Sequence, residues 1–354
     1  MKILINTPQL LGKGGVGTYY LSLKNHWQEN VRYHTSGSRK FLNGNFKIPG
    51  IFFLPSDIIK FVSILIFWKP DIIILNPSFI RNSLNRELVF LNLAFLFRKK
   101  VCVFFRGWHK EYETKVNIKA LCTQLNKSRI ILVLASEFKE KLTKWGICRP
   151  IEITTTKVDD FLLSNFDISK KKFDNKKILF LATIKKEKGI FEALKVMTFF
   201  NLSSYYVELN VAGIGPQLEN AKKYVRLKKI KNVHFLGHVS GEKLSQTFIE
   251  NDIFFFPSHG EGMPNSVLEA MAFGLPVLTT RVGGIQDFFE DGKMGLFLES
   301  TDPMHIADKI KYLVKRPELM KEMSIYNFEY AKKHFYSSVV SQRLKKIIQE
   351  VHTA

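Results

Sequence analysis

The sequence predicts an α/β protein of two doubly wound, Rossmann-like domains, each with a parallel sheet between layers of helices. Short apolar runs rich in β-formers recur along the chain, and the gaps between them leave room for a helix. The runs are continuously apolar instead of alternating, which is typical of strands covered on both faces. A chain of 354 residues is long enough for two domains, each with its own core.

The expected strands form two series, one in each half of the chain. In the first half they cover Lys2–Asn6, Asp71–Leu75, Val101–Phe105, Ile130–Ala135 and Ile151–Thr154. In the second half they cover Lys177–Ala182, Tyr206–Ala212, Asn232–Leu236, Asp252–Phe256, Pro276–Thr280 and Met294–Leu298. Strand and helix repeated on this scale are typical of doubly wound domains.

A lysine-rich segment marks the expected join between the domains. Residues 169–177 contain five lysines and almost no apolar side chain, which indicates a solvated connector. We therefore predict an N-terminal domain over residues 1–168 and a C-terminal domain over residues 169–329. Apolar positions at helical spacing between Asn327 and Val351 predict amphipathic helices, and we expect the helix at about 330–354 to pack back on the first domain.

The composition indicates a globular protein of a reducing compartment. Hydrophobic residues make up 45% of the chain and charged residues 24%. The three cysteines, Cys102, Cys122 and Cys148, show no metal-ligand spacing, and Cys102 lies in an apolar run where it is expected to be a small buried hydrophobe. We expect no disulfide framework and no structural zinc.

The apolar segments are read as too short for a membrane span. Met1–Asn6 resembles a first strand and not the apolar region of a signal peptide. The run Ile58–Trp68 has eleven residues and contains Lys60, whereas a span needs about 20. Leu88–Phe97 is also short. We expect a cytoplasmic protein that does not cross the membrane, with peripheral attachment to its inner face left open.

The net charge of +21 raises the alternative of a nucleic-acid-binding protein. Against it, the lysines are spread along the whole chain and no zinc finger, RNP-type strand or basic heptad helix is present. Attraction to anionic lipid or to phosphorylated substrates explains the charge equally well. We therefore expect no specific nucleic-acid partner.

Residues Gly12–Gly17 match the pattern G-x-G-x-x-G directly after the first strand. In a nicotinamide enzyme an acidic residue follows at the end of the second strand, and none stands near Val31–His34; Glu29 precedes that strand. A dinucleotide site is therefore not favoured. The glycines still allow close approach of backbone N–H groups to an anion, and Thr18 lies at a helix start. A tight turn without any ligand remains the alternative.

Two glutamates eight positions apart, Glu261 and Glu269, flank the start of a predicted helix. The strand Asp252–Phe256 ends just before them, and ligands bind beyond the carboxyl ends of strands in open α/β sheets. Gly262 and Pro264 set the turn into the helix, with Pro264 suited to its first position. Each carboxylate can accept hydrogen bonds from a pair of hydroxyls, and the amides between them favour a phosphate. Two polyols joined by a diphosphate describe a nucleotide sugar.

These residues resemble a known family. Glu261–Pro264, Leu268–Val277 and Thr280–Gly284 resemble the E-x7-E signature of retaining glycosyltransferases of family 4, which have the GT-B fold. Further matching segments are the N-terminal glycine loop, Lys188-Gly189, Val211–Pro216, Val233–Gly237 and Asp291–Leu296. The rest of the N-terminal half matches weakly, as expected where acceptors differ.

The resemblance implies roles at matching positions. Glu269 would bind the ribose hydroxyls, Glu261 would hold the donor sugar, and Lys188 would neutralise the diphosphate. The amides at the helix start would assist Glu261, and the N-terminal glycines would close on the donor. The donor-binding set is Gly14, Gly15, Thr183, Lys188, Gly262, Met263, Pro264, Asn265 and Glu269.

The chain departs from the family pattern at two places. Ala182-Thr183 stands where the family commonly has Gly-Arg, so Lys185 or Lys186 would substitute for the arginine, or Thr183 would donate a weaker hydrogen bond. The family's N-domain histidine follows a strand; here Arg106 aligns best and His109 comes three residues later. The catalytic candidates are therefore Glu261, Lys188, Arg106 and His109.

Together these features predict transfer of a sugar, with retained configuration, from a nucleotide diphosphate (UDP- or GDP-linked) to a hydroxyl of a glycan or lipid-linked acceptor. Polysaccharide or lipopolysaccharide synthesis at the cell surface is the expected setting. No Asp-x-Asp stands at a strand end, so neither a metal nor another cofactor is expected. The alternatives are a catalytically impaired nucleotide-sugar-binding protein, a phosphorylase or epimerase of the same fold, and the basic nucleic-acid-binding protein. A glycosidase is not favoured, because Glu269 on the helix is aimed at a nucleotide and not at water.

Overall fold

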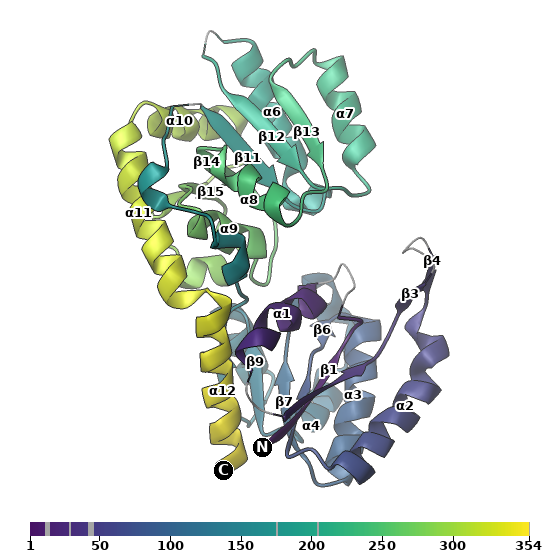
Figure 1. Ribbon diagram of the computed structural model, residues 1–354. Helices are drawn as coiled ribbons and strands as arrows, with labels where there is room; N and C mark the ends of the chain where they lie inside the picture. The colour runs from purple at the N-terminus through teal and green to yellow at the C-terminus, as the bar shows by residue number, and fades with distance from the viewer. Residues whose placement is uncertain (11–14, 28–29, 42–45, 175, 204, 354) are drawn as a thin grey trace. The chain divides into compact units, whose positions relative to one another are not determined.

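The computed structural model describes residues 1–10, 15–27, 30–41, 46–174, 176–203 and 205–353. The chain divides into two compact units, residues 1–156 with 337–354 (unit 1) and residues 157–336 (unit 2). Each unit contains a six-stranded parallel sheet with helices on both faces (Figure 1). The predicted fold class of two doubly wound α/β domains is confirmed.

The sheet of unit 1 has the strand order β10-β9-β7-β5-β1-β2. Its strands are β1 (Lys2–Thr7), β2 (Asn30–Thr35), β5 (Ile72–Leu75), β7 (Lys100–Phe104), β9 (Ile130–Val133) and β10 (Ile151–Ile153). All neighbouring pairs are parallel. The first-half strands that the apolar runs predict are all present.

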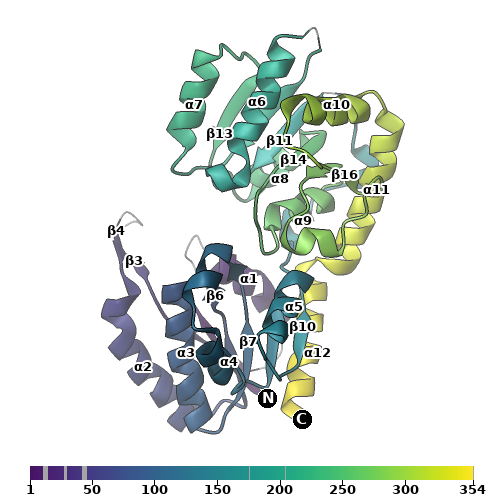
Figure 2. The same ribbon diagram turned by 180° about the vertical axis from the view of Figure 1, so that it is seen from behind.

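Helices cover both faces of this sheet. The first face carries α1 (Gly15–Leu23) and α12 (Ser337–Thr353), which contact each other, and α12 also contacts β7. The second face carries α2 (Leu54–Ser63), α3 (Arg81–Leu96), α4 (Ile118–Leu125) and α5 (Ser136–Lys144), seen from behind in Figure 2. The C-terminal helix thus completes the core of the N-terminal unit, where Val340, Leu344 and Ile348 are buried.

The sheet of unit 2 has the strand order β13-β12-β11-β14-β15-β16, again all parallel. Its strands are β11 (Lys177–Leu181), β12 (Glu208–Ala212), β13 (Val233–Gly237), β14 (Ile253–Phe256), β15 (Val277–Thr279) and β16 (Gly295–Phe297). On one face lie α6 (Ile190–Asn201), α7 (Leu218–Leu227) and α10 (Pro303–Val314). On the other lie α8 (Glu242–Ile249) and α9 (Asn265–Ala272), with α11 (Pro317–His334) packed on α9.

Short elements complete the described chain. The strands β3 (Arg39–Phe41) and β4 (Phe46–Ile48) pair antiparallel, and β6 (Ser78–Phe79) pairs with β8 (Gly107–Trp108). The single turns are η1 (Lys24–His26), η4 (Lys110–Lys115), η5 (Asp160–Leu163), η6 (Ile168–Lys170), η7 (Lys186–Lys188) and η8 (Gly283–Asp287). None of these was expected from the apolar runs.

The first boundary between the units lies at residues 156/157, whereas the sequence placed it at 168/169. The intervening segment belongs to unit 2 because its apolar side chains pack there. The backbone N–H of Val158 donates to the carbonyl of Phe335 at 2.7 Å, and the ring of Phe166 packs edge-on against Phe273 with centroids 5.0 Å apart. The second boundary, at 336/337, follows α11.

The lysine-rich segment is not a solvated connector throughout. The ammonium group of Lys171 donates to the carbonyls of Phe248 and Ile249 at the end of α8, and to that of Asn251. These distances are 3.1, 2.9 and 2.6 Å, and burial lowers the pKa of Lys171 to about 8. This lysine stabilises a helix terminus, where unpaired carbonyls attract a cation.

One helix in unit 1 is longer than the sequence suggested. The turn η2 (Gly50–Phe53), α2 and the π-turn η3 (Ile64–Trp68) run on as a single helix of 19 residues, Gly50–Trp68. Within the described residues it is the one helix long and apolar enough to cross a membrane by length and composition, and 22% of its apolar window is buried. The estimate of eleven residues was wrong because Asp57 and Lys60 interrupt the apolar pattern without ending the helix.

The buried face of this helix anchors it to unit 1. Phe61, Ile64 and Leu65 are buried in the core, and the carboxylate of Asp57 is fully buried in an ion pair with Arg39. The opposite face exposes Phe52, Ile59 and Ile66, which are 73%, 67% and 46% exposed. These residues are seven positions apart and therefore form one apolar stripe along the outer side.

Candidate functional site

The candidate site lies at the carboxyl ends of β11 and β14 in unit 2. These two strands are neighbours in the sheet although β12 and β13 lie between them in the sequence. The strand order therefore reverses here, and the loops that follow the two strands lead to helices on opposite faces of the sheet. Ligands of open α/β sheets bind in the crevice at such a reversal.

The two loops contact each other closely. The backbone N–H of His259 donates to the carbonyl of Glu187 at 2.9 Å. Gly189 has φ +80°, and a Cβ there would lie 2.1 Å from the carbonyl oxygen of Pro257. Only glycine is therefore compatible with this approach. This close approach of the two loops explains why a glycine follows Lys188.

Glu261 and Lys188, both predicted catalytic residues, form an ion pair between these loops. The ammonium of Lys188 donates to Oε1 of Glu261. The hydroxyl of Ser258 lies 2.9 Å from the same oxygen and 3.1 Å from the carbonyl of Glu187. The Ser258 hydroxyl is therefore placed to donate to either of these oxygens, and the carboxylate of Glu261 is the nearer one. The Glu261 side chain is 9% exposed and that of Lys188 26%, so the pair is open at the lysine.

Ser258 is a site residue that the sequence analysis missed. It is fully buried and follows β14 by two positions, in the segment Pro257–Gly260 that ends the strand. A small polar residue after a buried strand was the available signal. The hydroxyl fixes the orientation of the Glu261 carboxylate, which is a positioning role.

Glu269 lies in the second turn of α9 and is 9% exposed. Burial raises the pKa of its carboxyl above the usual 4.5; the nearby Lys157 acts in the opposite direction and Asp159 in the same direction. No hydrogen-bond donor from the described part of the chain reaches this carboxylate. Because burial disfavours its charged form, this carboxylate would gain from a pair of ligand hydroxyls that donate to it.

The start of α9 is backed by the loop after β15. Pro264 is the N-cap residue, one position earlier than predicted, and the helix begins at Asn265. Its N-cap side chain donates and accepts nothing, so no cap from Pro264 competes for the first amides of α9. Gly283 has φ +51°, and a Cβ there would lie 2.4 Å from the carbonyl oxygens of Glu261 and Gly262. The half-buried Gly262 and Met263 are thereby held in place.

Thr183, Lys185 and Lys186 are exposed on the loop after β11. None of the three forms a salt bridge within the described residues. Two unpaired lysines therefore follow Thr183 on the same loop as Lys188, and this loop is positively charged.

The two N-domain candidates have different surroundings in unit 1. The Arg106 guanidinium lies 3.8 Å from the ring centroid of Tyr19 and 4.2 Å from that of Phe104. Burial lowers the pKa of Arg106, and Tyr19 and Tyr20 partly oppose this shift. His109 follows β8, is exposed, and donates its backbone N–H to the carbonyl of Phe79 at 3.3 Å. Arg106 is thus held between aromatic faces, whereas His109 is accessible.

Gly14 lies outside the described residues. Gly15 is the first residue of α1, and no atom of the described residues lies within 4 Å of the position that its Cβ would occupy. Among the residues that the structure describes, no group of three His, Cys, Asp or Glu side chains is placed to hold a metal ion.

Comparison with known proteins shows which proteins this chain resembles. Residues 164–330 match the family model of glycosyl transferases group 1. The capsular polysaccharide biosynthesis glycosyltransferase CapM of Staphylococcus aureus is 29% identical over 235 residues, which cover 65% of this chain and 60% of CapM. The uncharacterized glycosyltransferase MJ1178 of Methanocaldococcus jannaschii is 26% identical over 176 residues, 49% of this chain and 48% of that protein. The matched part of the chain thus spans about half to three fifths of these relatives.

Solved structures match over the whole chain. Sucrose-phosphate synthase from Thermosynechococcus elongatus superimposes with a TM-score of 0.79 at 14% identity, covering 99% of both chains. Anabaena Alr3699/HepE in complex with UDP and glucose gives 0.76 at 15% identity, again over 99% of both chains. The GT-B fold is therefore confirmed, and the sequence matches support a glycosyltransferase. They do not favour the nucleic-acid-binding alternative.

Replacing Gly189 by alanine should separate the two loops of the site. The new Cβ would overlap the Pro257 carbonyl and force a left-handed backbone on a residue with a side chain. We expect a loss of stability of about 1–3 kcal/mol in thermal unfolding. Gly146→Ala is the matched control, since it also has positive φ but no atom within 4 Å of its Cβ position. Equal melting temperatures for the Gly189 variant and wild type would contradict the proposed close approach.

Glu269→Gln should stabilise the free protein while weakening its ligand complex. Because the folded pKa of Glu269 is raised, its contribution to stability is complete below the unfolded pKa of about 4.3 and is lost as pH rises through the folded pKa. Glutamine does not ionise, so the variant does not lose stability in this way. Its free energy of unfolding should therefore rise relative to that of wild type as pH rises through that window. Thermal unfolding of both proteins between about pH 4 and pH 8 measures this difference in stability. A constant difference across this range would show that Glu269 is not buried as an acid.

Proposed function

We propose that the protein is a retaining glycosyltransferase that moves a sugar from a nucleotide diphosphate to a hydroxyl of a glycan or lipid-linked acceptor. The observation that carries this proposal is the buried carboxylate of Glu269, which lacks a donor and lies on the helix that follows the paired Glu261. Two carboxylates in one segment suit the two polyol ends of such a donor. The match to glycosyl transferases group 1 supports the same assignment.

The donor would be bound by three kinds of group in unit 2. Glu269 would accept hydrogen bonds from the ribose hydroxyls. The diphosphate would lie at the start of α9, near the amides of Gly262, Met263 and Asn265, where the helix dipole favours an anion. Lys188 would then exchange Glu261 for a phosphate oxygen, which frees the Glu261 carboxylate for the hydroxyls of the sugar.

The transfer breaks the bond between the anomeric carbon and the diphosphate oxygen, and the electron pair leaves with the diphosphate. Lys188 and the α9 amides would stabilise the charge that develops on this leaving group. The acceptor oxygen bonds to the anomeric carbon, and its proton passes to the departing phosphate oxygen. Configuration is retained because the acceptor approaches from the face that the diphosphate leaves.

We propose that the charges of the chain itself neutralise the diphosphate and that no metal ion takes part. Lys188 is open to solvent on one side, and the unpaired Lys185 and Lys186 lie on the same loop. From unit 1 we assign substrate contact to His109, because it is accessible. Arg106 would act as a positioning residue that holds Tyr19 of α1.

The donor nucleotide that we propose is a uridine or guanosine diphosphate. Anabaena Alr3699/HepE, which shares the fold, was solved with UDP and with UDP-glucose. The capsular polysaccharide relative CapM supports an acceptor from cell-surface polysaccharide synthesis. We place the reaction at the inner face of the cytoplasmic membrane, where the apolar stripe of Phe52, Ile59 and Ile66 would enter the headgroup region.

Donor binding and transfer are tested with the purified full chain. Calorimetry should detect UDP or GDP, and Glu269→Ala and Lys188→Ala should each weaken binding at least about tenfold, since each removes a charge-assisted contact. Glu219→Ala is the matched control, because this glutamate is exposed on α7 and, among the described residues, its one salt bridge is with Lys222. With a nucleotide sugar and lipid-linked acceptors, NMR of the product should show the anomeric configuration of the donor. If no nucleoside diphosphate binds, the proposed function is wrong.

Membrane attachment is tested by co-sedimentation with vesicles of phosphatidylcholine and phosphatidylglycerol. We expect the wild-type chain to sediment with them and the double variant Ile59→Ser/Ile66→Ser to remain in the supernatant, because apolar area drives interfacial binding. Leu202→Ser, an 84% exposed leucine of unit 2, is the control. Sedimentation that the double variant leaves unchanged would refute a role for the stripe.

A further inference from the structure

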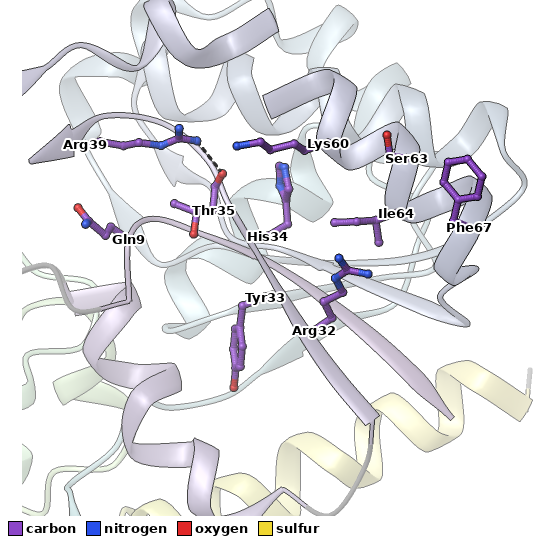
Figure 3. Close-up of a pocket in the computed structure, with 10 residues that line it drawn as sticks. All are labelled: Gln9, Arg32, Tyr33, His34, Thr35, Arg39, Lys60, Ser63, Ile64 and Phe67. Atoms are coloured by element: carbon purple, nitrogen blue, oxygen red, sulfur yellow. Dashed lines mark hydrogen bonds between the residues drawn. The ribbon is translucent and has the colours of Figure 1, made fainter. Parts of the chain in front are cut away.

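A pocket of about 690 Å³ lies wholly within unit 1, between the edge strand β2 and the helix Gly50–Trp68. Figure 3 shows its lining. One side is polar and basic, and the other is apolar. The residues that matter for its chemistry are Arg32, His34, Arg39, Lys60, Ile64 and Phe67.

The lining of this pocket carries positive charge. Three of its residues are cations, and none of the residues that line it is a carboxylate. Arg39 is compensated by the buried Asp57 and also donates to the carbonyl of Thr35 at 3.2 Å. Arg32 and Lys60 have no acidic partner among the described residues. Two uncompensated cations on one pocket favour an anionic ligand.

Strand geometry directs these groups into the same space. Side chains two positions apart in β2 project from the same face, so Arg32 and His34 both point toward the helix. Figure 3 shows the ends of Arg39 and Lys60 turned toward each other beside His34. Both cations lower the pKa of His34, as does its burial, which dominates; the resulting value of about 4 leaves the imidazole neutral near pH 7. The net positive charge of the pocket therefore rests on Arg32 and Lys60.

The imidazole of His34 is a fixed part of the wall. Its Nδ1 lies 2.7 Å from Oδ1 of Asn6, and its Nε2 lies 3.0 Å from the carbonyl oxygen of Asp57. Both neighbours are oxygen acceptors, so the neutral imidazole donates its single N–H to one of them. A ligand in the pocket would meet Arg32 and Lys60 first, because both side chains are exposed.

The apolar side of the pocket continues onto the protein surface. Phe67 lines the pocket and is 83% exposed, and Ile66 next to it belongs to the apolar stripe. Figure 3 shows Arg32 beside Ile64 and Phe67 at this end. An anion site that opens onto an exposed apolar strip fits an amphiphile better than a free phosphorylated sugar or a nucleic acid, which would leave the strip uncovered.

We propose that this pocket binds the phosphate group of a lipid phosphate, with Arg32 and Lys60 as its anion-binding residues. The hydrocarbon chain lies over Phe67 and Ile66, in continuity with the stripe. This inference rests on the proposed function, because it assigns the lipid-linked acceptor to unit 1. It names a binding site and a chemical class of ligand that the candidate site in unit 2 does not contain.

Geranyl phosphate, a short and soluble lipid monophosphate, is the probe. Calorimetry with the full chain should show binding of geranyl phosphate at least tenfold tighter than that of inorganic phosphate or of geraniol. The double variant Arg32→Gln/Lys60→Gln should lose at least tenfold in affinity for geranyl phosphate. Phe67→Ser should weaken the binding of geranyl phosphate while leaving the binding of inorganic phosphate unchanged. Lys139→Gln is the control, an exposed lysine on α5 at the opposite edge of the same sheet.

Each outcome decides the proposal. Equal affinity for inorganic and geranyl phosphate would show a simple anion site and overturn it, as would equal affinity for geraniol, which lacks the phosphate. Unchanged binding in the Arg32/Lys60 variant would also overturn it. Thermal unfolding checks that the variants fold, and UDP or GDP binding is measured in parallel. Nucleotide binding without geranyl phosphate binding refutes only the pocket, whereas the reverse result refutes the proposed donor site.

Discussion

The ion pair between Lys188 and Glu261 is the contact on which the candidate site depends. It joins two loops that follow neighbouring strands, β11 and β14, although the residues are 73 positions apart. In the free protein each charge compensates the other, so neither carboxylate nor ammonium is left unpaired in a partly buried site. A ligand that carries both an anionic group and hydroxyl groups can break this ion pair without leaving either charge unpaired. Its anion then binds Lys188, and its hydroxyls donate to Glu261.

The two glutamates of one short segment have different environments and therefore suit different roles. Glu261 is held by a lysine and by the Ser258 hydroxyl. Glu269 is buried, whereas Glu261 is half-buried, and no donor from the described chain reaches Glu269. Glu261 can therefore exchange Lys188 for a ligand, whereas Glu269 can accept hydrogen bonds from a ligand without losing a protein partner. The difference arises because Glu261 stands in a loop facing another loop, whereas Glu269 is fixed on the second turn of α9.

Strands such as β5, β9 and β14 were predictable because each is a continuous apolar run buried on both faces, and such a run can be identified without knowing which strands pair with it. Gly189 was indicated only by the family resemblance, whereas Glu261 and Glu269 were visible because local spacing predicts a loop and a helix. The pairing of Lys188 with Glu261 was not, because it is set by strand order and not by spacing. Lys171 looked solvated for a related reason: composition does not reveal that its ammonium meets the end of α8. Asp57 likewise appeared to limit an apolar segment, although Arg39 compensates its charge within the fold.

The last helix has a consequence for how the protein is made. α12 supplies buried residues to unit 1, and Ser337 at its start lies 3.2 Å from His26 Nε2, while Lys100 Nζ donates to the carbonyl of His352 at 2.7 Å. The ribosome must therefore add the whole of unit 2, residues 157–336, before this covering element emerges. At synthesis rates of about 5–20 residues per second that interval is roughly ten to forty seconds. During this time the nascent first unit presents the face of β7 that α12 later covers, and a chaperone that shields such surfaces would act on it before the second unit is finished.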